Sequence, residues 1–511
     1  MPPLPRSLTL EGLPSGRCDQ GVAIGLVDLP EQQRQPALRW HPVTDGHLGL
    51  CGGPRSGRTT ALATLAIALS RAWSPDDLHL HVIDAASGQL RDLAALPHTG
   101  TLLTRAQPRL VARLVARLSA EVRHRLGQGR ADAPPVVLLV DGWDALVESL
   151  DKLDHGRASE ELIALLRDGP AAGLRAVVAG DRALLTSRLS AVLPERLLLR
   201  VTDPTDLLLA GLPVASLSVD PAPGRGVRTR DGASVQLATA AGQVSTPGQA
   251  TAVAHINAAT TGGMAPAVAL AAEAARASWP SPRTVGRVRV IELPASVEIE
   301  QVVHPNPGGR RALLGIGGDE GHAVVLDLDA HRSVLVAGPP GSGRSTALHT
   351  MAHTLHRVGA AVLAVCPRSS PLDAGPWPVL GPFDERSVAD QLTAQPQTCV
   401  LVDDVELLAD SALDAVLDAL IRQRGPTALV LAGATSALLG LFRGASVSAR
   451  GARTGVLLQP GTASDGDLLG VRVELSDRPG PGRGVLVVAG EQQALQVGRT
   501  VANAISADWG N

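Results

Sequence analysis

The sequence contains two similar stretches that decide its fold, LGLCGGPRSGRTTALATL at residues 48–65 and LVAGPPGSGRSTALHTM at residues 335–351. Each stretch runs from an apolar segment through a glycine-rich turn into a segment with helical spacing. Each fits the pattern G-x-x-x-x-G-[basic]-[ST] of a phosphate-binding loop. In such a loop, glycines let backbone N–H groups turn toward a phosphate, and the following helix adds its positive dipole end. The sequence therefore predicts two P-loops in tandem.

The residues expected to bind nucleotide are those of the two loops and of the first helical turn after each. They are Gly52, Gly53, Pro54, Arg55, Ser56, Gly57, Arg58, Thr59 and Thr60 in the first copy, and Gly338, Pro339, Pro340, Gly341, Ser342, Gly343, Arg344, Ser345 and Thr346 in the second. The hydroxyl at the end of each pattern can ligate Mg²⁺. ATP and Mg²⁺ are the predicted cofactors, with no residue assigned as a fixed metal ligand.

Arginine stands in both loops where this motif usually has lysine, at Arg58 and Arg344. Lys152 is the only lysine in the chain, so a general bias toward arginine accounts for the replacement. Lysine presents a compact, mobile charge, whereas arginine is planar and bulkier. Because the loop amides remain, we expect nucleotide binding to survive better than transition-state stabilisation. Slow hydrolysis of a bound nucleotide, active hydrolysis and an empty site within a retained fold all stay open.

An apolar run that ends in aspartate follows each loop. Residues 136–140 precede Asp141, and residues 399–402 precede Asp403. Such runs are typical of buried parallel strands, and an acid at the strand end is expected to hold the Mg²⁺ shell opposite the P-loop hydroxyl. Asp404 is the one candidate for a catalytic carboxylate. The residue after Asp141 is a glycine, so the first copy is expected to be the poorer catalyst.

Apolar strand-like runs alternate with helical segments after each loop, and this order predicts an α/β fold with mostly parallel sheets flanked by helices. The turns APGRGV and GPGRGV occur near the end of the two copies, which indicates an internal duplication. The predicted first domain is 1–240 and the predicted second, shorter domain is 286–511. Residues 241–285, rich in Ala, Gly and Thr, are the predicted connection.

The composition limits the classes of partner. The net charge is −3 and the sequence pI is near 6.5, so the chain lacks the basic excess that usually accompanies duplex DNA binding. The first residues lack the pattern of a signal peptide, and no uninterrupted apolar run reaches the roughly 18 residues of a membrane span. We therefore expect a cytoplasmic chain. The four cysteines have no metal-ligand spacing.

The ordered motifs resemble the C-terminal tandem ATPase domains of the EccC family, the FtsK/SpoIIIE-type motors of type VII secretion. The matching segments are IGLVDLPEQQRQPALRW (24–40), GGPRSGRTTAL (52–62), LPHTG (96–100), VDGWDAL (140–146), LGIGGDEGHAVVLDLD (314–329), AGPPGSGRSTAL (337–348) and VLVDDVELL (400–408). This resemblance covers nearly the whole chain. It implies two P-loop NTPase domains of the RecA/FtsK type that bind nucleotide with weak or no turnover. It also implies that the last domain can dock the C-terminal signal of secreted substrates.

The chain departs from the family pattern in ways that imply partners. Family members carry membrane spans and a competent first ATPase domain ahead of such a pair, and FtsK-type motors place a glutamate directly after the strand-end aspartate. The resemblance thus implies a membrane-anchored FtsK/EccC-type ATPase subunit, secreted protein substrates and a homo-oligomeric ring as partners. That subunit would bring the chain to the inner face of the plasma membrane. A DNA-translocating FtsK/SpoIIIE-type ATPase, with DNA as a less favoured partner, and a non-hydrolysing structural adaptor stay open.

Overall fold

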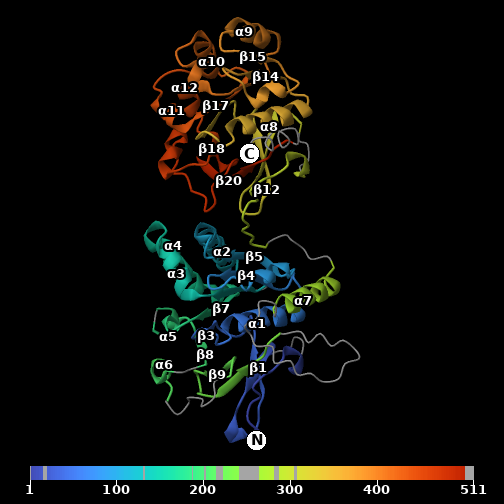
Figure 1. The fold of residues 1–511 in the computed structure, drawn as a ribbon, viewed down its shortest axis with the longest axis vertical. Helices are drawn as coiled ribbons and strands as arrows, with labels where there is room; N and C mark the ends of the chain where they lie inside the picture. Colours follow the sequence, from blue (N-terminus) through green and yellow to red (C-terminus); the bar gives the residue numbers. More distant parts are fainter. Residues whose placement is uncertain are drawn as a thin grey trace. The chain divides into compact units, whose positions relative to one another are not determined.

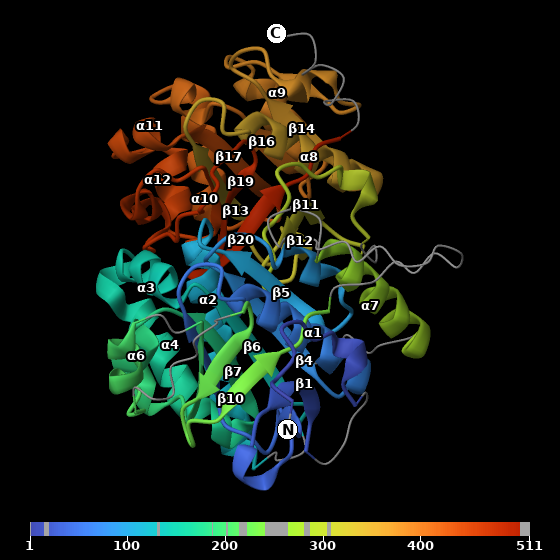
Figure 2. The same ribbon diagram turned by 60° about the horizontal axis from the view of Figure 1, so that its bottom comes forward.

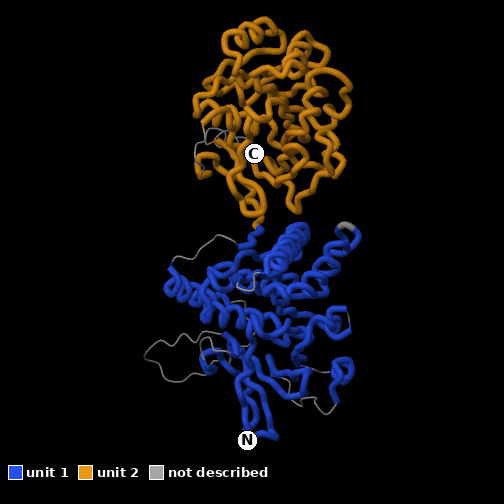
Figure 3. Tube along the Cα trace, turned by 180° about the vertical axis from the view of Figure 1, so that it is seen from behind, with its two compact units in different colours: residues 1–290 blue, residues 291–511 orange. Residues whose placement is uncertain are grey.

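Two ten-stranded sheets with the same strand order form the framework of the chain (Figure 1). The computed structural model describes residues 2–14, 20–129, 133–186, 188–200, 203–213, 222–240, 264–280, 287–303 and 308–500. It divides into two compact units, Met1–Val290 (unit 1) and Ile291–Asn511 (unit 2), coloured separately in Figure 3. Each unit contains one sheet and one predicted P-loop.

The sheet of unit 1 joins a parallel part to an antiparallel part. Its order is β2-β1-β10-β9-β8-β3-β7-β6-β4-β5. The strands from β8 to β5 run parallel, whereas β9, β10, β1 and β2 pair antiparallel. Their bounds are β1 Val22–Val27, β2 Ala37–Trp40, β3 Leu48–Gly52, β4 His79–Asp84, β5 Thr99–Thr104, β6 Val136–Asp141, β7 Leu174–Gly180, β8 Glu195–Leu199, β9 Arg225–Arg228 and β10 Ser234–Leu237.

Helices cover both faces of this sheet, which is why the parallel strands are apolar throughout. One apolar core lies under α1 and α7, and a second lies under α2, α3 and α4. Figure 2 shows α7 on one side of the unit and α3 and α4 on the other. Strand β6 shows the division, since Val137 and Leu139 face the first core while Leu138 and Val140 face the second. The helix bounds are α1 Arg58–Ala72, α2 Pro108–Gln128, α3 Trp143–Asp151, α4 Arg157–Asp168, α5 Ala183–Thr186, α6 Pro204–Leu209 and α7 Ala265–Ser278.

Unit 2 repeats this architecture in the order β12-β11-β20-β19-β18-β13-β17-β16-β14-β15. Its strands are β11 Arg311–Gly317, β12 His322–Asp327, β13 Ser333–Gly338, β14 Val362–Val365, β15 Val379–Leu380, β16 Cys399–Val402, β17 Ala428–Ala434, β18 Gly455–Leu458, β19 Arg483–Val488 and β20 Glu491–Val497. Helix α8 (Arg344–Arg357) packs on one face, and α9 (Glu385–Ala394), α10 (Ala412–Gln423), α11 (Thr435–Gly440) and α12 (Ala445–Arg450) pack on the other. The predicted α/β fold with two P-loop units is confirmed.

The second unit is shorter partly because one helix is. The crossover from β5 to β6 in unit 1 contains α2, which has 21 residues. The corresponding crossover from β15 to β16 in unit 2 contains α9, which has 10 residues. This helix therefore accounts for part of the predicted shortening of the second copy.

Helix α7, which lies within the predicted connection 241–285, packs against α1. Its residues Ala267, Val268 and Ala271 belong to the same apolar core as Leu62 and Leu69 of α1. Residues 241–263 lie outside the described residues, and the predicted domain bounds stay predictions. No helix in the described ranges has both the length and the apolar content needed to cross a bilayer.

Candidate nucleotide-binding sites

The first glycine-rich loop joins the carboxyl end of β3 to α1. A Cβ atom on Gly52 would lie 2.6 Å from the Leu199 carbonyl oxygen, so the loop leaves the strand where only glycine fits. Gly57 caps α1 with φ +97°, a left-handed conformation that suits glycine. The helix start has no capping side chain and no acid in its first turn. Its amide groups and dipole are therefore available to an anion.

The predicted loop residues divide into an exposed tip and a buried base. Gly53, Pro54 and Arg55 are exposed, while Ser56 is 1% exposed. Within the described chain the Ser56 hydroxyl has no hydrogen-bond partner. The Ser56 carbonyl accepts a 3.0 Å hydrogen bond from the Gly224 amide of the PGRG turn, which thus supports the loop from behind. Thr60 lies half-buried on α1.

The structure brings the predicted hydroxyl and strand-end acid of unit 1 together. Thr59 Oγ1 donates a 2.6 Å hydrogen bond to Asp141 Oδ2 at the end of β6. Asp141 is 1% exposed, and this burial raises the pKa of its carboxyl, while the bond from Thr59 opposes the rise. The hydroxyl and the carboxylate are the two protein oxygens that a P-loop Mg²⁺ shell uses. The residues of unit 1 therefore fit a magnesium–nucleotide site.

Two residues next to this pair, Arg58 and Gly142, differ from the pattern that the sequence motif of a hydrolysing P-loop motor usually has. Arg58 makes no hydrogen bond or ion pair to the described part of the chain. Gly142 follows Asp141 with φ +78°, and a Cβ atom there would lie 2.8 Å from the Ala86 nitrogen. The backbone after β4 thus occupies the space that a glutamate side chain at Gly142 would need.

The second loop has the same backbone. Gly343 caps α8 with φ +95°, again with no capping side chain and no acid in the first turn. A Cβ atom on Gly338 would lie 2.4 Å from Ser342 Oγ, and the Ser342 carbonyl accepts a 2.8 Å hydrogen bond from the Gly482 amide. The tip residues Pro339, Pro340 and Gly341 are exposed.

The acids and the arginine of unit 2 are arranged differently from those of unit 1. Arg344 Nη1 donates to the Gly338 carbonyl at 2.7 Å, and its Nη2 donates to Asp404 Oδ1 at 3.0 Å. The other oxygen of Asp404 accepts from Arg368 Nε. Asp404 is 4% exposed and adopts φ +45°. The carboxylate proposed for catalysis is therefore engaged by two guanidinium groups.

The strand-end acid of unit 2 does not meet the loop hydroxyl. Asp403 Oδ2 accepts a 2.8 Å hydrogen bond from Ser370 Oγ, which lies in the segment after β14. No hydrogen bond joins Asp403 to Ser345 within the described residues, and Ser345 and Thr346 are half-buried on α8. Of the two predicted hydroxyl–acid pairs, only the first is formed.

Several residues at these sites were not predicted from the sequence. Arg368 and Ser370 come from the segment after β14, and Gly224 and Gly482 from the PGRG turns. The repetition of PGRG was a usable signal that the turn has a position-specific role. No local pattern marks Arg368 or Ser370.

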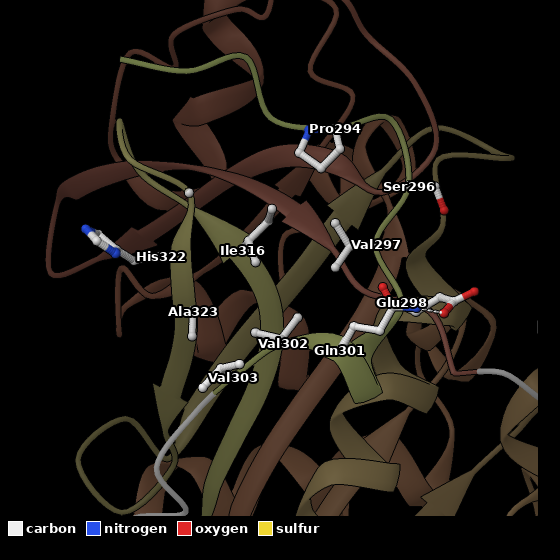
Figure 4. Close-up of a pocket in the computed structure, with 11 residues that line it drawn as sticks. Pro294, Ser296, Val297, Glu298, Gln301, Val302, Val303, Ile316, His322 and Ala323 are labelled. Carbon is white, nitrogen blue, oxygen red and sulfur yellow. Dashed lines mark hydrogen bonds between the residues drawn. The ribbon is translucent and has the colours of Figure 1, made fainter. Parts of the chain in front are cut away.

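A pocket of about 640 Å³ in unit 2 lies apart from the loop (Figure 4). It is formed by the segment before β11 and by the β11–β12 hairpin, with Val297, Val302 and Ile316 among its apolar lining residues. No residue of the P-loop or of the strand-end acids lines it. It is therefore separate from the candidate nucleotide site.

Comparison with known proteins supports the resemblance drawn from the motifs. Residues 14–130 match the FtsK/SpoIIIE family. The ESX-4 secretion system protein EccC4 of Mycobacterium tuberculosis is 27% identical over 560 aligned residues, covering 97% of this chain and 42% of that protein. The chain thus spans less than half the length of this relative.

Solved structures confirm the tandem fold. EssC (ATPases 2 and 3) of Geobacillus thermodenitrificans matches with a TM-score of 0.70 at 18% identity, covering 98% of this chain and 100% of that one. EccC (ATPases 2 and 3) of Thermomonospora curvata, solved in complex with a signal sequence peptide, matches with a TM-score of 0.60 at 22% identity, covering 98% and 99%. The predicted resemblance to the tandem ATPase domains of EccC-type proteins is confirmed.

Proposed function

We propose that this chain is the nucleotide-binding regulatory part of a type VII secretion-like motor. Unit 1 binds ATP·Mg²⁺ and turns it over slowly. The chain recognises secreted protein substrates and regulates a membrane-anchored ATPase subunit of the EccC type from the cytoplasmic side. The observation that carries the nucleotide part is the Thr59–Asp141 hydrogen bond beside an uncapped helix N-terminus.

Each group in unit 1 has a defined role in this proposal. The loop amides between Gly52 and Thr59 bind the phosphates, because helix N-terminal N–H groups favour an anion. Thr59 and Asp141 hold the magnesium shell, which would neutralise phosphate charge when the ion is bound. Arg58 supplies a positive charge that forms no hydrogen bond or ion pair with another described group.

Slow turnover follows from what the site lacks. Hydrolysis needs a carboxylate or amide that orients the attacking water. Gly142 has no side chain, and the backbone at Ala85–Ala86 leaves no room for one. The planar guanidinium of Arg58 is also a different electrostatic partner from a lysine ammonium group.

The secretion role rests on relatedness rather than on a located peptide site. The relative EccC4 is a secretion system protein, and the matching structure of Thermomonospora curvata EccC was solved with a signal sequence peptide. These comparisons favour secretion over the DNA-translocation alternative. A fluorescent peptide bearing the C-terminal signal of a secreted substrate is expected to bind this chain, as measured by anisotropy, more tightly than a scrambled peptide. Equal binding of the two peptides would contradict substrate recognition.

The nucleotide proposal is tested by calorimetry and a steady-state hydrolysis assay on the wild type, Thr59→Val and Arg58→Lys. The wild type is expected to bind Mg·ATP with micromolar affinity and to hydrolyse it slowly. Thr59→Val should lose roughly tenfold in affinity with Mg²⁺ present and little in its absence, because the hydroxyl serves the metal shell. Arg58→Lys should raise the rate of ATP hydrolysis, because an ammonium group replaces the planar guanidinium at the phosphates.

Thr393→Val is the matched control, because Thr393 is an exposed threonine on α9 outside both loops. It should bind nucleotide as the wild type does. A wild-type turnover above about 1 per second, in the range of competent phosphoryl-transfer enzymes, would show that the regulatory interpretation is wrong. If neither the wild type nor any variant binds nucleotide, the chain would instead be a structural adaptor.

A further inference from the structure

The two loops carry the same arginine but hold it differently. Arg58 of unit 1 makes no hydrogen bond or ion pair within the described chain, whereas Arg344 of unit 2 is 8% exposed and bonded at both terminal nitrogens. We call Arg344, Asp404 and Arg368 the Asp404 cluster. Because the two units share one topology, Arg58 of unit 1 serves as an internal reference for Arg344 of unit 2.

The difference has a cause in two positions of the repeat. Strand β4 pairs with β6 so that Ile83 lies beside Val140, one residue before Asp141, and β14 pairs with β16 so that Val365 lies beside Val402, one residue before Asp403. Counting on from these registers, Asp404 occupies the place of Gly142, and Arg368 occupies the place of Ala86. Unit 1 therefore has neither the carboxylate nor the second guanidinium of the cluster.

The cluster crosses the mouth of its own loop. Arg344 connects the Gly338 carbonyl, at the start of the loop, to Asp404, which follows the strand-end acid. In a P-loop protein the space between these two points receives the terminal phosphate and its metal ion. A phosphate entering there would have to displace a buried, charge-assisted hydrogen bond, and such bonds are strong.

Arg368 keeps the cluster together from outside. Its side chain is 61% exposed, and it bonds the Asp404 oxygen that Arg344 leaves free. Asp403, the acid expected to face the metal, is meanwhile bonded to Ser370 and not to Ser345. Both acids of unit 2 are thus turned away from the roles that Asp141 can take in unit 1.

We propose that the Asp404 cluster closes the second P-loop, so that Asp404 and Arg368 act as positioning residues that hold Arg344 across the phosphate site and confine nucleotide to unit 1. This inference rests on the proposed function, because it assumes that unit 1 binds nucleotide. Nucleotide enters unit 2 only when Arg344 is released from Asp404.

The test is photolabelling of the full chain with Mg·8-azido-ATP, with labelled peptides mapped by mass spectrometry to unit 1 or unit 2. The wild type is expected to be labelled in unit 1 alone. Asp404→Gly copies the residue of unit 1 and suits the left-handed backbone at this position. The Asp404→Gly variant should also be labelled in unit 2. The affinity of unit 2 for the nucleotide should rise at least roughly tenfold over the wild type, which corresponds to the loss of one competing charge-assisted hydrogen bond.

The matched control is Asp410→Gly. Asp410 also has positive φ, at 63°, and pairs with an arginine, Arg443, at 2.7 Å, but this pair is exposed and outside the loop. Its labelling should equal that of the wild type. Arg344→Lys is the second variant, because one ammonium group lacks the fork that reaches the Gly338 carbonyl and Asp404 together. It should also gain the label in unit 2.

The outcomes separate this inference from the proposed function. Equal labelling of both loops in the wild type would overturn the inference. The inference would also be overturned if unit 2 stays unlabelled in both Asp404→Gly and Arg344→Lys. It would equally be overturned if the control Asp410→Gly gains the label in unit 2 to the same extent. A wild type without label in unit 1 would instead overturn the proposed function, whatever unit 2 does.

Discussion

At the scale of single residues, Gly142 stands where related motors have a glutamate, and the backbone conformation at this position requires glycine. The sequence alone presents it as a missing catalytic acid beside Asp141. In the structure its φ of +78° and the approach of Ala85 and Ala86 exclude a side chain. The residue after the strand-end acid in unit 1 is therefore fixed by packing, and the slow turnover proposed above follows from this constraint.

We expect Gly142→Glu to destabilise unit 1 and to add no hydrolysis. A left-handed non-glycine residue costs about 1–2 kcal/mol and the contact with Ala86 adds to this, so the free energy of unfolding should fall by roughly 2–4 kcal/mol. Urea unfolding measures the loss. Gly127→Ala, on α2 with open space at its Cβ, is the control and should be neutral or slightly stabilising. A Gly142→Glu variant as stable as the wild type and faster in hydrolysis would refute the steric argument.

At the scale of elements, the PGRG turn of each unit donates a backbone hydrogen bond to the glycine-rich loop. The sequence suggested that it ends each copy, but in the structure it begins the β9–β10 and β19–β20 hairpins that join the parallel strands to the leading strands. Its arginine also fastens the first segment of each unit. Arg225 donates to the Leu4 and Pro5 carbonyls, and Arg483 donates to those of Leu293 and Pro294.

Replacement of Arg483 should therefore loosen unit 2 at its N-terminal segment. Arg483 is 9% exposed, so Arg483→Met leaves two carbonyl acceptors unpaired in a largely buried place. We expect the free energy of unfolding to fall by about 1–3 kcal/mol. Differential scanning calorimetry measures the change. Arg472→Met, at an exposed arginine of the same unit, should shift the transition little, and an equal shift in both variants would count against the fastening role.

At the scale of the whole molecule, buried histidines make unit 1 sensitive to acid. Burial lowers the pKa of His79 to about 4 and that of His81 to about 3, and it also lowers the pKa values of His47 and His98. Neither ring nitrogen of His81 finds a hydrogen-bond partner within the described chain. These imidazoles are therefore neutral in the folded unit and have their ordinary pKa near 6.5 when it unfolds.

The sign of the pH dependence follows from this difference. Below pH 6.5 the unfolded chain binds more protons than the folded unit, so the stability of unit 1 is complete above pH 6.5 and decreases as the pH falls toward 4. His79 and His81 should each contribute about 1 kcal/mol per pH unit in this range. Calorimetric scans at pH 7.5 and 5.5 should show the decrease. His81→Leu should reduce it, whereas His322→Gln, at an exposed histidine, should not. An unchanged pH dependence in His81→Leu would contradict the assignment.

The sequence by itself determined the two P-loops, the strand-end acids Asp141 and Asp403, the alternation that makes the sheets mostly parallel, and the duplication. These features are local, because a glycine spacing or an apolar run acts on neighbouring residues. The late strands β8–β10 and β18–β20 were not among the elements predicted from the sequence. Only the tertiary structure decided which side chains the acids meet.

Thr59 reaches Asp141 across 82 residues, whereas Asp403 turns to Ser370 and Asp404 to Arg344 and Arg368. These partners come from separate loops that the sheet assembles at the carboxyl ends of its strands, and no spacing along the chain specifies which of them will meet. Because these partners come from different loops, the two P-loops share one sequence motif but are surrounded by different side chains.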